Sequence, residues 1–304
     1  MESWRRFLES DFFYSFKKSP VAIVSFVVAM VLILSAVLAP LIAPFDPFNP
    51  ATLNLMNGFT QPGEPNAFTG ESFFMGTDDQ GRDVFSTILY GMRISLFVGF
   101  AAVFLAMILG VALGLTAAMA GGRTDTIIMR IADIQLSFPA ILIAMLIFGI
   151  AKGITPPDMR NQVAIWVLIL SIGLSDWVQF ARVVRGAAMV ERKKEYVEAA
   201  TLIGRGPVII ALRHILPNIV ASVLVIATIS LALAIIAEAT LSFLGVGAPP
   251  TQPSLGTLIR IGQGFLFSGE WWILFFPSVT LLLLALSVNL LGDWLRNTLN
   301  PNME

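Results

Sequence analysis

The side chains that could carry out chemistry are few in this chain and lie far apart. Its 304 residues include no cysteine and a single histidine, His214. Metal sites built from thiolates or clustered histidines are therefore excluded. We expect no catalytic residue and no metal ligand, because no cluster of Asp, Glu, His or Cys suggests a reaction centre. A phosphate-binding G-x-x-x-x-G-K-[ST] motif is also missing, so the chain should bind no ATP or other cofactor by itself.

One polar segment, residues 190–217, has a pattern suited to contact with another protein. Glu198-Ala199-Ala200 precedes Gly204, and Leu216-Pro217 closes the segment. Helical spacing would place Tyr196, Ala199, Ala200 and Ile203 on one small apolar face. Gly204 should end a short helix in a left-handed conformation, and Pro217 can open the next helix. His214 is expected to pack within this segment.

The rest of the chain has the composition of a membrane protein. Hydrophobic residues make up 56% of it and charged residues 13%, against about half and a quarter in soluble domains. The net charge of −1, without a basic run, gives no indication of nucleic-acid binding. A spanning helix needs about 20 apolar residues. Six stretches are candidates: Val21–Ile42, Ser95–Ala120, Ile134–Ile150, Val163–Val183, Ile219–Leu244 and Trp271–Leu291.

Two of these spans leave the count open to five or seven. Pro139 interrupts the third span, and Asp176 weakens the fourth. The first span could be read as a secretory signal. Its apolar run is too long for one and lacks a cleavage pattern, so we expect it to be retained as a helix. The predicted fold is an all-α integral membrane protein with six transmembrane helices.

The basic residues indicate the orientation. Of the 19 Lys and Arg residues, 14 fall in the terminal tails and in the connections on their side, including 190–217. The positive-inside rule therefore places both termini and this segment in the cytoplasm. On the opposite side, residues 45–92 should be irregular. Residues 245–270 should contain a short interfacial or re-entrant helix, with Leu255, Leu258, Ile259 and Gly262 in helical register.

Polar and small residues inside the spans have two readings each. Asp176, Gln179 and Arg182 recur every three residues and could line a translocation path, although a helix that simply protrudes into the cytoplasm is favoured. Glu238 could belong to the same path, but a structural polar contact is favoured because it lacks ionisable companions. Gly110 and Gly114 predict close helix packing, within this chain rather than against a partner.

Two motifs carry a family resemblance. The pattern from Glu198 to Pro217 resembles the EAA loop of ABC importer permeases, so we reject an ordinary charged loop. Residues 75–96, MGTDDQGRDVFSTILYGMRISL, resemble the signature of the dipeptide/oligopeptide/nickel permease family, especially its DppC/OppC-type subunit. Thr87 departs from the usual arginine of that signature.

The resemblance implies a type I importer permease in the bacterial inner membrane, with a peptide as cargo. In that family the EAA loop docks on ABC ATPases, so the resemblance implies coupling roles for Tyr196, Glu198, Ala199, Ala200, Gly204, His214 and Pro217. The implied partners are a homologous second permease, two ATPase subunits that hold ATP and magnesium, and an extracytoplasmic binding protein. Nickel, glutathione-like and other small solutes are alternative cargoes.

The expected organisation has three parts. Residues 1–92 hold the tail, first helix and outer loop. Residues 93–293 form the permease core with its coupling loop at 190–217, and 294–304 form a cytoplasmic tail. Rival readings fit less well, because a secondary transporter should show inverted repeats and paired intramembrane charges. A membrane enzyme would need clustered catalytic side chains.

Overall fold

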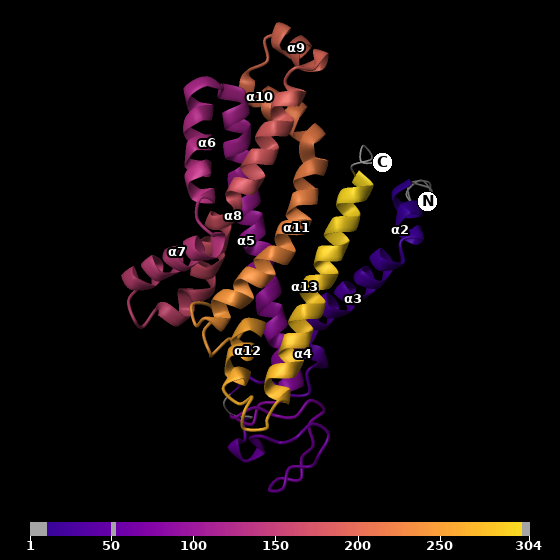
Figure 1. Cartoon of the computed structure of the whole chain (residues 1–304), viewed down its shortest axis with the longest axis vertical. Coiled ribbons are helices and arrows are strands. Elements are labelled where there is room, and N and C mark those ends of the chain that lie inside the picture. Colours follow the sequence, from indigo (N-terminus) through magenta and orange to yellow (C-terminus); the bar gives the residue numbers. More distant parts are fainter. Residues whose placement is uncertain (1–10, 50–52, 300–304) are drawn as a thin grey trace.

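The computed structural model describes residues 11–49 and 53–299. Within these ranges the regular secondary structure is helical, and the only β-pairing consists of isolated β-bridges in the loops. Figure 1 shows an elongated bundle whose helices run mostly along its long axis. The elements are α2 (Asp11–Lys18), α3 (Pro20–Val37), α4 (Ala39–Ile42), the 3₁₀ turn η1 (Leu55–Asn57), α5 (Val84–Ala120), α6 (Gly122–Leu136), α7 (Ala140–Ile154), α8 (Arg160–Glu191), α9 (Glu195–Leu202), α10 (Pro207–Ile210), the π-helical turn η2 (Ala211–Ile215), α11 (Leu216–Phe243), α12 (Leu255–Gln263) and α13 (Trp272–Leu299).

Five of the described helices are long and apolar enough to cross a membrane, and a bent pair can supply a sixth span. Four predicted spans correspond to α3, α5, α11 and α13, and a fifth to the longer helix α8. The third predicted span, Ile134–Ile150, is wrong as a continuous helix. The chain bends by 95° between α6 and α7, at the position of Pro139. Proline cannot donate a backbone hydrogen bond and disfavours helical geometry in the residue before it.

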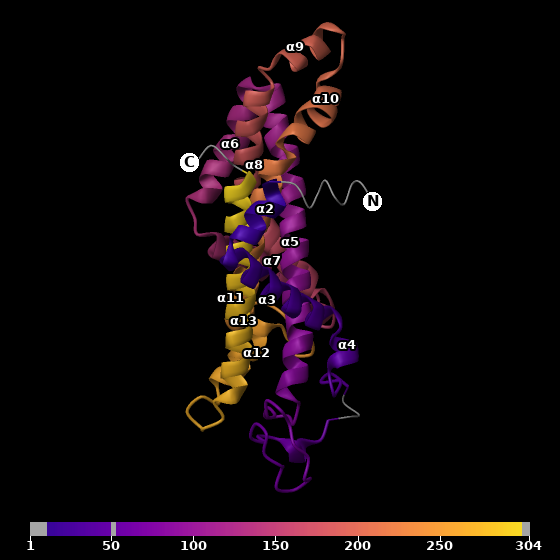
Figure 2. The ribbon, with the colours of Figure 1, turned by 90° about the vertical axis from the view of Figure 1, so that its right-hand side faces the viewer.

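The two ends of the bundle are different. Helices α9 and α10 form one end, and the outer loop, of which residues 43–49 and 53–83 are described, lies at the other (Figures 1 and 2). The first and last described helices lie together: Phe16 of α2 stacks edge-on against Trp294 of α13, with ring centroids 5.2 Å apart. Ser15 and Thr298 share a hydrogen bond of 3.3 Å. The chain therefore starts and finishes its described part on one side of the bundle.

The packing of α5 against α8 forms the centre of the core. Gly110 and Gly114 are buried on α5 and face the backbone of α8. A Cβ atom on Gly110 would lie 2.3 Å from the Cβ of Phe180, and one on Gly114 would lie 2.6 Å from the carbonyl oxygen of Ala181. These two glycines therefore serve packing within this chain, which is the reading that their spacing favoured.

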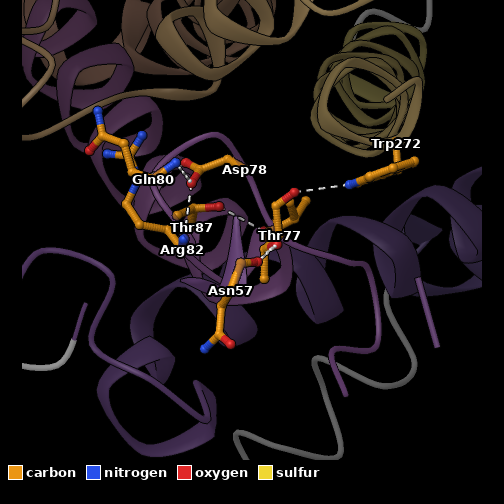
Figure 3. A network of polar contacts seen from close by, with 8 residues as sticks. Asn57, Thr77, Asp78, Gln80, Arg82, Thr87 and Trp272 are labelled. Atoms are coloured by element: carbon orange, nitrogen blue, oxygen red, sulfur yellow. Dashed lines mark hydrogen bonds and ion pairs between the residues drawn. The ribbon is translucent and has the colours of Figure 1, made fainter. Parts of the chain in front are cut away.

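The outer loop is irregular, but the irregular stretch predicted for residues 45–92 is wrong at its end, because α5 begins at Val84 after the N-cap Asp83. A dense polar network holds the loop (Figure 3). The hydroxyl of Thr77 donates to the carbonyl of Asn57, and the indole N–H of Trp272 donates to the carbonyl of Thr77 at 3.0 Å. Arg82 pairs with Asp78 at 2.6 Å, with both side chains buried. Burial raises the pKa of Asp78 although the neighbouring guanidinium acts to lower it. This loop is thereby attached to the start of α13.

Candidate functional site

The segment 190–217 folds into a short helical hairpin at one end of the bundle. Helix α9 is followed by a turn and by α10, which begins at Pro207 (Figure 2). Gly204 has a φ of +82° just after α9. The amide of Arg205 donates to the carbonyl of Ala200, and the amide of Gly204 donates to that of Thr201. This is the predicted left-handed helix end, in which glycine avoids the steric penalty of a Cβ atom.

A polar cluster fixes the base of this hairpin. The hydroxyl of Tyr196 donates to the carboxylate of Glu191 at 2.6 Å, and Lys194 pairs with the other oxygen of that carboxylate. The side-chain amide of Asn218 donates to the Tyr196 oxygen at 3.1 Å and to the carbonyl of His214 at 2.6 Å. Partial burial, followed by the hydrogen bond to Glu191, raises the pKa of Tyr196. The cluster therefore joins the end of α8, α9 and the start of α11.

The apolar face expected on α9 is divided in the structure. Ala200 is buried beside Val197, whereas Tyr196, Ala199 and Ile203 are exposed. The face predicted as one surface is thus partly an internal packing surface. Glu198 is exposed, on the same helix. The residues that sequence reasoning missed are Leu202, next to Ile203 in the chain, and Val208 in α10, which are 89% and 67% exposed. Large apolar residues in a charged segment were the available signal for this exposed edge.

The turn around His214 and Pro217 connects the hairpin to a long helix. Pro217 lies in the first turn of α11, as predicted, but helical structure already begins at Pro207 and continues through the π turn η2. Since Pro217 has no backbone N–H, the wider π turn before it accommodates the missing hydrogen bond. His214 lies half-buried in that turn and contributes its carbonyl to the polar cluster.

The polar residues proposed for a translocation path lie in separate environments. Arg182 on α8 pairs with Asp133 of α6 at 2.5 Å, and both side chains are about half exposed. One turn further, Arg185 binds Asp125 of α6 through two nitrogens. Gln179 is exposed, and Asp176 is partly buried. These arginines attach α6 to α8, which supports the reading that α8 extends beyond the apolar bundle.

Glu238 lies in the interior of the bundle. Its side chain is fully buried, and its two carboxylate oxygens accept hydrogen bonds from Ser95 at 2.6 Å and Ser242 at 2.7 Å. The Ser95 oxygen in turn accepts from the amide of Leu255 at the start of α12. The group therefore joins α5, α11 and α12, and this environment favours the structural role over the translocation path.

Comparison with known proteins matches two family descriptions. The sequence profile of "binding-protein-dependent transport system inner membrane component" covers residues 110–304. The profile of "N-terminal TM domain of oligopeptide transport permease C" covers residues 2–62. Together they cover most of the chain, with residues 63–109 between the two matches.

Individual relatives match over almost the whole length. The dipeptide transport system permease protein DppC of Haemophilus influenzae is 36% identical over 97% of this chain and 95% of its own length. The oligopeptide transport system permease protein OppC of Bacillus subtilis is 34% identical over 98% of this chain and 90% of its own. The glutathione transport system permease protein GsiD of Pectobacterium atrosepticum is 36% identical over 100% and 91%.

A solved structure has a similar fold. A chain of the MetNI methionine ABC transporter, in an inward-facing conformation, superposes with a TM-score of 0.54 at 21% identity. The match covers 70% of this chain and 96% of the other.

Proposed function

This chain belongs to the family of binding-protein-dependent transport system inner membrane components, the membrane permeases of ABC importers, and from that premise we propose how it is driven and what it carries. Paired with a homologous second permease, it forms half of a path for di- or oligopeptides through the bacterial inner membrane. The α9–α10 hairpin receives the motion of an ATPase on the cytoplasmic side. Two ATPase subunits hold ATP and magnesium, and a binding protein delivers the cargo from outside.

The observation that carries this proposal is the exposed apolar edge at Leu202, Ile203 and Val208. Leu202 and Ile203 lie at the end of α9, and Val208 lies in α10, in a hairpin whose base is fixed by hydrogen bonds to Glu191 and Asn218. A protein partner that covers the edge would bury apolar surface, which stabilises association by about 25 cal/mol per Å². A rigid base is needed as well, because a flexible loop would absorb the displacement of the docked partner and would not transmit it to α8 and α11.

The step from docking to transport is a shift between two conformations. ATP binding on the partner changes the distance between the two docked hairpins. Only a differential contact with each state can move such an equilibrium. The hairpin is continuous with α11 through η2 and is bonded to the end of α8 through Tyr196. Its displacement therefore acts on two spans at once, as a rigid-body switch requires.

Retention of the ATPase by the membrane complex tests the proposal. We expect the Leu202→Ser, Val208→Ser double variant to lose ATPase subunits when the complex is purified in detergent. The matched control is Ile127→Ser, which removes a similarly exposed apolar side chain, 60% exposed, from α6. The proposal fails if the double variant retains the ATPase as well as the unchanged chain does.

A glutathione-like cargo is the second candidate, because the GsiD permease is as similar as the dipeptide permease, at 36% identity. Uptake of a labelled dipeptide and of labelled glutathione into cells that express the whole transporter separates the two. If unlabelled dipeptide reduces uptake of the labelled dipeptide and unlabelled glutathione does not, the cargo is a peptide.

A further inference from the structure

A small open cavity of about 110 Å³ lies in the half of the molecule that carries α12, away from the α9–α10 hairpin. Its wall comes from the end of α7, the start of α8, the turn after α11 and one residue of α12. Lys152, Arg160 and Arg260 line it, and none of its lining residues is acidic. Two parts of the chain that are distant in the sequence, the α7–α8 junction and α12, thus bring their positive charges to one cavity.

These cations have no carboxylate partner within the described residues. The ion pairs found there involve other side chains, and the arginine of the outer loop, Arg82, is matched by Asp78. Arg160 donates its Nε hydrogen to the carbonyl of Thr155 at 3.2 Å. Like charges around one cavity repel one another, and a bound anion would relieve that repulsion.

Two further features favour an anion at this position. The first turn of the 32-residue helix α8 lines the cavity, carries no acidic residue and has no side-chain cap, so the positive end of its dipole lies at the cavity. The nearest acidic residue in the sequence, Asp158, precedes the helix, is exposed and does not line the cavity. Gly245 leaves space on the opposite wall, whereas the backbone of Gly247 packs closely against Ser242. A guanidinium nitrogen of Arg260 lies 3.5 Å from where a Cβ of Gly245 would stand.

We propose that this cavity binds the free terminal carboxylate of a peptide as the cargo enters from outside, an inference that rests on the proposed function. A guanidinium matches the planar carboxylate with paired N–H donors, and a lysine adds a point charge. The volume suits a carboxylate with the residue that bears it. Buried Phe148 and Ala164 are part of its lining and can contact a small apolar side chain on that residue, and a volume of about 110 Å³ leaves no room for the acyl chains of a lipid.

Binding of dialanine to the full chain, placed in nanodiscs of neutral phosphatidylcholine, tests this proposal by ligand-detected NMR. We expect dialanine amide, which lacks the carboxylate, to bind about tenfold more weakly than dialanine, because charge-assisted hydrogen bonds are lost. The Lys152→Gln, Arg260→Gln double variant should lower dialanine affinity by a similar factor. Arg260→Lys keeps the charge and should retain more binding than Arg260→Gln.

The matched control is Arg93→Gln, which removes an exposed cation from α5 that does not line the cavity. It should bind dialanine as the unchanged chain does. Thermal unfolding of each variant establishes that a loss of binding is not a loss of fold.

Equal affinity for dialanine and its amide would overturn the proposal. So would displacement of dialanine by phosphatidylglycerol in the nanodisc together with loss of phosphatidylglycerol binding in the double variant, since the site would then hold a lipid headgroup. Failure here differs from failure of the proposed function, because ATPase retention by the hairpin does not depend on this cavity.

Discussion

At the scale of single residues, the side chains that matter most for stability are buried polar groups that depend on a few hydrogen-bond partners. Glu238 is the clearest case, since a buried carboxylate depends on its hydrogen bonds for stability. Ser95 donates to it and also accepts from the amide of Leu255, so one hydroxyl connects two helices to the start of α12. Ser95 is therefore one of the residues that fix the position of α12, together with Thr257, whose hydroxyl donates to the carbonyl of Ala248.

Replacing Ser95 with alanine should destabilise the protein by about 1–3 kcal/mol, because the variant leaves a carboxylate oxygen and a backbone amide unsatisfied. Ser222→Ala, on the exposed surface of α11, is the control and should change little. Thermal unfolding in nanodiscs measures both. Equal midpoints for the two variants would show that the hydrogen bonds of Ser95 add no net stability.

Gly204 is critical for a different reason, namely its backbone. With φ at +82° and open space around its Cα atom, a substitution meets no neighbour but forces a side chain into the left-handed region. Gly204→Val should therefore cost about 1–2 kcal/mol at the end of α9 and abolish transport, while substrate capture by the binding protein stays intact. Gly206 has a φ of −67° and equally open space, so Gly206→Val is the matched control. Uptake by the Gly204 variant equal to that of the control would contradict the coupling role.

The sequence predicted the conformation of Gly204 because a glycine at that spacing after a helix-forming run has a local physical cause. The exposure of Leu202 and the bonds of Asn218 could not be predicted in the same way. They depend on where η2 and α11 lie relative to α9, which is a tertiary property.

At the scale of elements, close approach of α5 and α8 is the feature most sensitive to volume. A methyl group on Gly110 would lie 2.3 Å from Phe180 and 2.6 Å from the carbonyl oxygen of Trp177. Gly110→Ala should therefore cost about 2–3 kcal/mol or more, because the backbone must move. Gly186→Ala on α8 meets nothing within 4 Å and should be neutral or slightly stabilising. The yield and the melting temperature of the purified chain report the difference, and similar melting temperatures would contradict it.

The elements also show where pattern reasoning reaches its limit. Apolar length located five spans, at α3, α5, α8, α11 and α13. It could not reveal that α6 leaves the apolar bundle and lies on the extension of α8, where Asp125 and Asp133 meet Arg185 and Arg182. Pro139 signalled an interruption, but the 95° bend depends on these ion pairs and on the hydrogen bonds between Gln135 and α8. A sequence window cannot contain both partners of such contacts.

At the scale of the whole molecule, the two ends of the bundle present different features and are joined by long continuous helices. One end presents an apolar edge on a rigid base, and the other holds the ordered outer loop and the cationic cavity. Helix α5 extends from the outer loop to the side of α9 and α10, and α11 returns from η2 toward α12 (Figures 1 and 2). A displacement at one end can therefore reach the other through rigid elements, as transport by alternating access requires.

The orientation of these two ends is the basis of this scheme, and the absence of cysteine from the sequence makes it directly testable. Leu202 is 89% exposed at the hairpin, and Phe267 is 98% exposed in the connection between α12 and α13. A membrane-impermeant maleimide added to intact spheroplasts should label the Phe267→Cys variant and not the Leu202→Cys variant. Inverted membrane vesicles should give the opposite result. Labelling of the Leu202→Cys variant in intact spheroplasts would place the hairpin outside the cell, where no cytoplasmic ATPase could bind it. That result would contradict both the proposed topology and the proposed coupling role of the hairpin.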